Sequence, residues 1–449
     1  MKPRRNPRQR FLKFIIRLLR WIWRIFYTIG REIITKLRQF ISYLGQRTLS
    51  IFVLILLIFF SSVILAGILP SPQIFEGNLV VKNLSFTYAG QESNKLFLNN
   101  IREISQIEGE GNQTFILNGR FSNPSDQILN QKLLQLNSLK ILLPHEKSQW
   151  IISPATTKQP SELKISELRL QPKTSINSLS YNPYNRRLSL PLTTTEQNDV
   201  KVKTDELNEA AQLSISLGDY PIKLTLTGYK LEDLGLQDSP DSPNPIELIF
   251  QPDNSQLSLS LNKTTRLSVN LPDLRKVNSE EWLWGDLDVK NVNFEQLKQT
   301  GININDEIYN STIIKGQIRM GERELKIESN QFLLISKPGI NRLLNLEIIP
   351  PKPPQEINVQ IADEAVEVST PPEGLEVRFA GEAKQIQVGL DRRLPVRSLK
   401  SSFLANFFSN DVIIAMISFF SAAIISLLSW IVNDFLSWLS ANSKAAANP

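Results

Sequence analysis

The sequence contains no cysteine and only one histidine, His145. The absence of cysteine excludes disulfide frameworks, thiol catalysis and cysteine-ligated zinc or iron–sulfur sites. A single histidine excludes multi-histidine metal sites and leaves at most one imidazole base. Phosphate-binding glycine loops, the serine-hydrolase elbow and the zinc-protease motif are missing as well. We therefore predict no catalytic residue, no metal site and no cofactor, and we expect a protein that is not an enzyme.

The remaining ionisable side chains have ordinary structural explanations. His145 lies in a polar turn, LLPHEKSQW, after an apolar run. The acidic segment 103–110 is typical of a solvated strand edge or loop. Asp238 and Asp241 fall in an apparent turn, where carboxylates accept hydrogen bonds from the nearby backbone. A catalytic acid–base pair or a calcium site is a weaker interpretation of these residues, because no spaced acidic loop is present.

Acidic residues are almost missing from the first 48 positions. These positions carry 13 Lys and Arg but only one acid, Glu32, so their net charge is +12 and the other 401 residues sum to −6. The basic residues recur at helical spacing, and bulky apolar residues fill the other face. This pattern predicts an amphipathic helix in the headgroup layer, with its cations on anionic lipid phosphates. The predicted lipid-binding residues are Arg10, Lys13, Arg17, Arg20, Arg24, Arg31 and Arg38.

Three other roles are open for this basic arm. An Arg-rich and acid-poor start also resembles an organelle transit peptide. The arm could equally bind an acidic face of a partner protein. Binding to nucleic acid would use the cationic face alone and leave the bulky apolar face in water. We therefore expect a lipid surface rather than nucleic acid.

Two long segments lack charged residues. Residues 51–69 are 19 apolar or small residues, which span about 28 Å as a helix and match the hydrocarbon thickness of a bilayer. Pro70 and Pro72 end this segment. Residues 412–432 form a second uncharged run of 21 residues. Both runs predict transmembrane helices, in preference to buried core helices or, for the first run, a cleaved signal peptide.

The basic arm also predicts the orientation of the chain in the membrane. Positively charged flanks stay cytoplasmic, so we expect the N-terminus inside and the residues between the two runs in the periplasm or a lumen. Four basic residues before the second run oppose this orientation: Arg392, Arg393, Arg397 and Lys400. The alternative is a second segment that lies in the membrane without crossing it.

Small residues in the second run recur at spacings of three or four. This spacing places them on one helix face, which is the pattern that lets transmembrane helices approach closely. We predict that this face packs against the first span, a copy of itself or another subunit. The residues are Ala415, Ser418, Ala422, Ser426 and Ser429.

The region between the two runs alternates strictly between apolar and polar residues. This period of two predicts antiparallel strands with one buried face. We expect hairpins formed by residues 213–217 with 222–226, 257–261 with 267–271, 316–320 with 323–329, 357–361 with 366–368, and 375–379 with 386–390. Short helices are expected only at 208–212 and near Phe294. The predicted fold is membrane-anchored and mainly β: an antiparallel β-sandwich or extended sheet between two transmembrane helices, preceded by the amphipathic helix.

Proline-rich stretches at 239–245, 350–354 and 370–372 suggest domain boundaries. The alternative is that these prolines lie in the loops of one large sheet. The predicted organisation is an arm at 1–48, a first span at 49–70, β lobes at 71–238 and 246–349, a small β unit at 355–400, a second span at 411–433 and a tail at 434–449.

Trp282 and Trp284 alternate onto one face of a predicted strand, either as core residues or as a platform for a partner. The predicted function is a scaffold, assembly or tethering module in a membrane complex. Its expected partners are anionic lipids at the arm and proteins at the second span and the β region. The alternatives are a sheet that handles lipid or another small ligand fed from the membrane, and a membrane-bound enzyme. A lipid-handling trough predicts a continuous uncovered apolar face.

Overall fold

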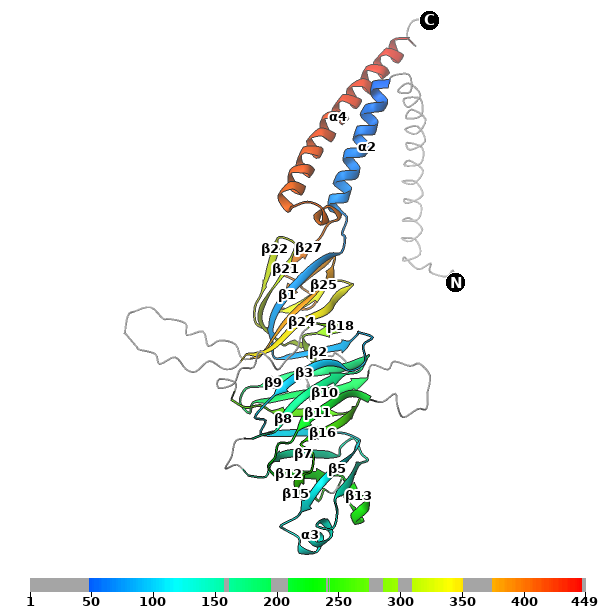
Figure 1. The fold of residues 1–449 in the computed structure, drawn as a ribbon. Helices are drawn as coiled ribbons and strands as arrows, with labels where there is room; N and C mark the ends of the chain where they lie inside the picture. Colours follow the sequence, from blue (N-terminus) through cyan, green and yellow to red (C-terminus); the bar gives the residue numbers. More distant parts are fainter. Residues whose placement is uncertain are drawn as a thin grey trace, which may run out of the picture. The chain divides into compact units, whose positions relative to one another are not determined.

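The computed structural model describes residues 48–156, 161–194, 209–239, 241, 243–273, 286–297, 309–349 and 374–445. The described residues form a mainly antiparallel β structure and two long apolar helices (Figure 1). They fall into two compact units. The helix unit contains the described residues of 1–69 and 402–449, and the β unit contains those of 70–401.

The helix unit consists of two long helices and one short turn of helix. Their bounds are α2 (Thr48–Ile68), η3 (Phe403–Asn406) and α4 (Asn410–Ala445). Both long helices have the length and apolar composition needed to cross a membrane. α2 ends two residues before Pro70, as predicted. α4 continues well beyond the predicted end of the second span, and no glycine or proline interrupts the sequence from Asp434 to Ala445.

The β unit is built on one antiparallel ladder of 18 strands. The pairings run in the order β22–β21–β1–β25–β24–β18–β2–β9–β10–β17–β4–β7–β12–β15–β5–β6–β13–β14. Their bounds are β1 (Gln73–Val81), β2 (Asn83–Tyr88), β4 (Gln106–Glu110), β5 (Gln113–Ser122), β6 (Ser138–Leu143), β7 (Gln149–Pro154), β9 (Thr174–Asn182), β10 (Arg187–Thr194), β12 (Ile222–Thr227), β13 (Lys230–Leu231), β14 (Leu236–Gln237), β15 (Ile246–Pro252), β17 (Arg266–Asn270), β18 (Leu287–Asn293), β21 (Ile313–Met320), β22 (Arg323–Ile327), β24 (Gly339–Ile349) and β25 (Gly374–Ala383).

Three smaller sheets complete the described β unit. The first is the four-stranded sheet β16–β11–β8–β3, and the others are β23–β26–β27 and β19–β20. Their bounds are β3 (Lys95–Ile101), β8 (Lys164–Leu170), β11 (Glu209–Ser216), β16 (Gln256–Asn262), β19 (Glu295–Leu297), β20 (Tyr309–Ser311), β23 (Phe332–Ile335), β26 (Gln385–Gly389) and β27 (Arg397–Lys400). The helices among the described residues of this unit are α3 (Gln127–Leu133) and η2 (Glu232–Leu234).

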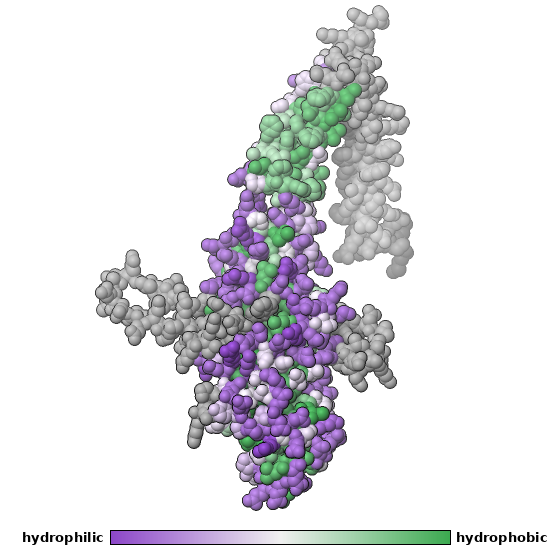
Figure 2. All heavy atoms as spheres, in the orientation of Figure 1, coloured by the Kyte–Doolittle hydropathy of each residue, from purple (hydrophilic) through white to green (hydrophobic). Residues whose placement is uncertain are grey.

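The inward side chains of the long ladder and of the four-stranded sheet share one hydrophobic core. Trp150 of β7 and Phe97 of β3 are both fully buried in this core. Figure 2 shows mostly hydrophilic residues on the visible face of the β unit and an apolar surface on α2 and α4. This distribution follows the predicted alternation, because each strand turns one set of side chains inward and the other to solvent.

Three of the five predicted hairpins are wrong, and the predicted hairpin of 357–361 with 366–368 lies outside the described residues. β11 and β12 belong to different sheets, as do β16 and β17, and β25 and β26. The six alternating residues of β16 and β17 are nevertheless buried, as predicted. Two strands that face each other across a core bury the same residues as two strands that pair side by side, so alternation cannot distinguish these arrangements. The β21–β22 hairpin is confirmed, with Gly321 at a φ of +61° in its turn.

The predicted short helices are also wrong. β11 begins at Glu209, inside the segment predicted to be helical, and β19 follows Phe294 directly. α3 was not predicted, although Asp126 marks its start. The Asp126 carboxylate accepts hydrogen bonds from the N–H groups of Ile128 and Leu129.

Strand pairings cross all three proline-rich stretches. β12 pairs with β15 across 239–245, and β24 pairs with β25 across 350–373. Residues 70–401 therefore belong to one compact unit, and these stretches connect strands that are neighbours within it.

Candidate membrane anchor and interaction surfaces

α2 and α4 pack against each other within the helix unit. The rings of Phe60 and Phe420 are stacked with their centroids 5.0 Å apart. A Cβ atom on Gly67 would lie 3.0 Å from Cδ1 of Ile417, so the glycine allows close approach at this end of the pair. The bulky residues Ile417 and Phe420 therefore form the face of α4 that contacts α2, and the small residue at this contact is Gly67 of α2.

The predicted small-residue face of α4 is exposed along its whole length. The hydroxyls of Ser418, Ser426 and Ser429 donate to the carbonyl oxygens four residues earlier, at 2.8, 3.0 and 2.8 Å. These bonds satisfy the hydroxyls within the helix. Since α2 lies on the face of Ile417 and Phe420, packing of this stripe against a second copy or another subunit remains a prediction. The stripe consists of Ala415, Ser418, Ala422, Ser426 and Ser429.

Two groups of predicted site residues lie outside the described residues. One group is the lipid-binding arm, and the other is the pair of tryptophans that was proposed as a partner surface. The residues concerned are Arg10, Lys13, Arg17, Arg20, Arg24, Arg31, Arg38, Trp282 and Trp284.

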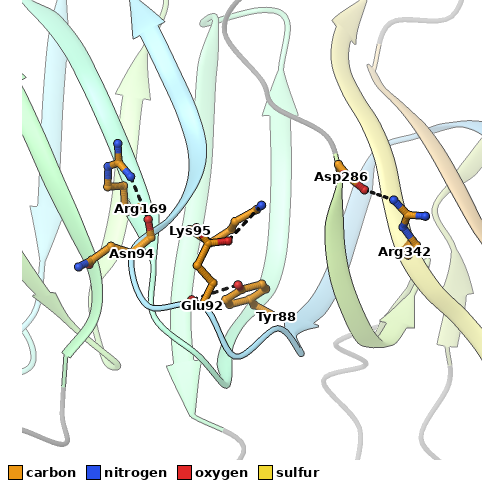
Figure 3. A network of polar contacts seen from close by, with 7 residues as sticks. All are labelled: Tyr88, Glu92, Asn94, Lys95, Arg169, Asp286 and Arg342. Atoms are coloured by element: carbon orange, nitrogen blue, oxygen red, sulfur yellow. Dashed lines mark hydrogen bonds and ion pairs between the residues drawn. The ribbon is translucent and has the colours of Figure 1, made fainter.

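β18 joins two halves of the long ladder. It pairs with β24 through only two residue pairs, Leu287–Leu343 and Asp288–Arg342, and with β2 on its other side. Asp286 forms an ion pair with Arg342 directly beside this junction (Figure 3). The hydrogen bond and the charge of this guanidinium lower the pKa of Asp286 below its ordinary value. The ion pair thus ties the two strands together where the backbone ladder between them is shortest.

A second polar cluster fixes the connection from β2 to β3 near the same junction. The Tyr88 hydroxyl donates to the Glu92 carbonyl oxygen at 3.1 Å, and Arg169 donates to the Asn94 carbonyl oxygen at 3.1 Å. Lys95 forms an ion pair with Glu92 at 3.4 Å. Burial, followed by the nearby acids, raises the pKa of Tyr88. Each residue drawn in Figure 3 has a polar partner from its own unit, which indicates a structural role for the cluster.

A cleft of about 330 Å³ opens beside β18, where it diverges from β24. Apolar side chains such as Phe294, Leu333 and Ile340 line it. At its rim, Arg392 lies 3.5 Å from the carboxylate of Glu295, whose side chain is only 9% exposed. The Arg392 guanidinium also lies 5.7 Å from the centre of the Tyr309 ring. The arginine therefore attaches the loop between β26 and β27 to the rest of the β unit.

That loop, residues 390–396, presents three large aliphatic side chains to solvent; we name it the tip hairpin. Leu390, Leu394 and Val396 are 68%, 71% and 77% exposed. The loop is held by backbone hydrogen bonds, from Leu394 N–H to the Asp391 carbonyl at 3.1 Å and from Val396 N–H to the Val388 carbonyl at 2.9 Å. Sequence reasoning missed it, although the three apolar residues in the turn LDRRLPV are a visible signal.

The acids considered from the sequence do not gather into a reactive group. Glu108 pairs with Arg187 at 2.8 Å, and Glu110 with Arg266 at 3.8 Å. His145 is exposed in its turn. Within the described residues, no three His, Cys, Asp or Glu side chains come together as metal ligands.

Asp238 has the role expected of an acid in a turn. It is 7% exposed, and its carboxylate accepts hydrogen bonds from the N–H groups of Gly228 at 2.6 Å and Asn244 at 2.9 Å. The carboxylate closes the connection from β14 to β15.

No protein-family profile matches the chain, and no characterised protein of similar sequence was found.

Proposed function

We propose that this chain is a non-catalytic integral membrane protein that displays its β unit on the extracytoplasmic side as a scaffold or tether. α2 has 21 residues, which is about 31 Å of helix and matches the hydrocarbon thickness. α4 packs against it, so the two helices enter the bilayer as one hairpin. The basic arm before α2 favours the cytoplasmic side for the N-terminus and binds anionic headgroups there.

The observation that carries the scaffold proposal is the closed core of the β unit. A trough for lipid requires a continuous apolar face left open to solvent. The apolar side chains of the described strands instead form one buried cluster, as between two facing sheets. Among the described residues of this unit, the exposed large apolar ones are spread over several strands and turns: Ile74, Ile116, Ile128, Leu134, Tyr184, Tyr220, Leu344, Leu390, Leu394 and Val396.

The tip hairpin is the surface of the β unit best suited to a protein partner. It offers preformed aliphatic contacts beside Arg392 and Arg393, and arginine is enriched at interfaces. The edge strand β22 is less suitable for strand addition, since it exposes Arg323, Glu324 and Lys326. Charged side chains on an edge oppose pairing with another chain.

Membrane topology is tested by labelling single cysteines, because the chain has none of its own. Tyr184→Cys introduces a thiol at a site that is 96% exposed in the β unit. Asn6→Cys introduces one in the arm. In intact cells or sealed vesicles, we expect an impermeant maleimide to label only one of the two variants, and both after detergent is added. Equal labelling before detergent, or release of the protein by alkali, would contradict the two spans.

The scaffold role is tested by a photo-reactive amino acid at Leu394 in native membranes. We expect a discrete protein adduct that disappears when Leu390 and Val396 are both replaced by serine. The same photo-reactive residue at Tyr184 is the matched control, because this site is even more exposed but lies on a polar turn. If neither position gives a protein adduct and the purified protein carries bound lipid in its β unit, lipid handling replaces the scaffold proposal.

A further inference from the structure

The chain between β27 and α4 forms a tight elbow, residues 402–409, at the end of α2. The Phe403 N–H donates to the Leu69 carbonyl oxygen at 3.0 Å. The N–H groups of Phe407 and Phe408 both donate to the Leu404 carbonyl oxygen at 3.0 Å. Leu404 is 8% exposed, and its Cδ1 atom lies 3.5 Å from the position of a Cβ on Gly67. The elbow is therefore fixed to the helix pair by backbone bonds and one buried leucine.

The same elbow turns its three phenylalanines outward. Phe403, Phe407 and Phe408 are 49%, 67% and 44% exposed, although phenylalanine is among the residues most often buried. The rings of Phe403 and Phe407 lie 5.6 Å apart and form one apolar surface. Together the three side chains expose on the order of 300 Å². A surface of this size on a short, rigid turn calls for an apolar occupant.

The position of the elbow identifies that occupant. Its rings continue the exposed apolar surface of Ile68 and Leu69 at the end of α2, and of Val412 at the start of α4. Polar residues flank the rings on both sides, Ser402 before them and Ser409, Asn410 and Asp411 after them, and Asn406 lies between Phe403 and Phe407. Apolar rings beside serine, asparagine and aspartate match the layer where acyl chains meet headgroups. The Asp411 carboxylate also lies in the first turn of α4, where a negative charge is favourable.

We propose that the elbow inserts Phe403, Phe407 and Phe408 into the outer leaflet and so fixes the depth of the α2–α4 pair. This inference rests on the proposed membrane insertion of the pair. The lipid contact is a third one, independent of the two spans and of the basic arm on the opposite face.

The test uses nitroxide labels on single-cysteine variants of the full chain in phosphatidylcholine vesicles containing a minority of phosphatidylglycerol. Phe407→Cys reports on the elbow. Ile58→Cys, at a site 60% exposed on α2, reports on the span, and Tyr184→Cys reports on the aqueous β unit. The depth of each label follows from its collisions with oxygen, which enters the bilayer, and with a water-soluble nickel complex.

We expect the label at 58 to be deepest and the label at 407 to lie about 5–10 Å below the headgroups, with the label at 184 in water. A label at 407 that is as accessible to nickel as the one at 184, while the label at 58 remains in hydrocarbon, overturns the inference but leaves the spans intact. Nickel access at 58 as well overturns the proposed membrane insertion itself. A label at 407 shielded from both nickel and oxygen assigns the elbow to a protein contact and also overturns the inference.

Discussion

A glycine under a buried tryptophan provides the sharpest test of the β unit. Gly109 of β4 lies directly opposite Trp150 of β7 in the antiparallel register. A Cβ atom at Gly109 would lie 2.3 Å from Cε2 and 2.4 Å from Nε1 of the indole ring. The ring is fully buried, and its Nε1–H donates to Gln113 Oε1 at 3.1 Å, so it has little freedom to move. We predict that Gly109→Ala destabilises the β unit.

The magnitude follows from two opposing effects. Overpacking a buried site costs about 1–3 kcal/mol, and the fixed ring places this site near the upper limit. Replacing glycine by alanine in an extended strand recovers about 0.4–1 kcal/mol of unfolded-state entropy. The net loss for Gly109→Ala is therefore about 2 kcal/mol. In a Trp150→Ala background the clash disappears, so the same substitution stabilises by about 0.4–1 kcal/mol.

The assay is a double-mutant cycle on the full chain in detergent, with urea unfolding followed by circular dichroism in the β region. Trp150→Ala alone costs about 3–5 kcal/mol. The decisive quantity is the coupling between the two sites, which we expect to be about 3 kcal/mol. If Gly109→Ala has the same effect with and without the indole ring, the close approach of ring and backbone is wrong.

Three further predictions concern the β unit. Gly77→Ala repeats the effect at β1, because its Cβ would lie 2.3 Å from the Phe379 ring opposite; we expect a loss of about 2 kcal/mol in the same urea assay, and near neutrality if Phe379 is also alanine. Asp126→Ala removes the cap of α3 and should cost about 1 kcal/mol, whereas the exposed neighbour Ser125→Ala should cost less in the same measurement. Burial and then the charge of Asp238 raise the pKa of Tyr229 above 10.0. The Tyr229 hydroxyl therefore stays protonated to a higher pH in the folded state than in the unfolded state. The free energy of unfolding should fall as the pH rises above about 10, because only the unfolded state loses this proton there. Tyr229→Phe should flatten this alkaline decline in urea midpoints, and an unchanged slope would refute the assignment.

The burial of strand residues is predictable from the sequence, but the pairing of the strands is not. Leu257, Leu259 and Leu261 are buried in β16 as their alternation requires. The adjacent strand β17 buries its own alternating residues in the same core while pairing in the long ladder. Local pattern reports only which side of a strand faces the core. The choice between neighbours in one sheet and neighbours across the core depends on contacts far apart in the sequence.

The candidate surfaces divide in the same way. The two long helices follow directly from runs without charge, since composition alone determines which segments are long and apolar enough. The contact between the two helices cannot be predicted in this way. Small residues suit any close packing, so the small-residue stripe on α4 does not indicate which helix it packs against. Gly67 and Ile417 make the contact instead. The tip hairpin was missed because three exposed aliphatics in a turn have the same local pattern as a buried strand end.

The depth of α4 in the proposed membrane follows from the elbow and from the length of α2 together. α4 has 36 residues, or about 54 Å, and is much longer than the roughly 31 Å of α2. If the elbow lies at the outer boundary, a hydrocarbon layer of about 30 Å ends some 20 residues after the start of α4. That level falls at Trp430, which is 37% exposed and belongs to the residue type favoured at membrane interfaces. Asp434 then lies one turn further, among headgroups rather than acyl chains. The length of α2, the elbow and Trp430 all place the helix pair at the same depth in the bilayer. A shift of the elbow away from the bilayer would draw Asp434 into the hydrocarbon layer, which is energetically unfavourable for a charged side chain.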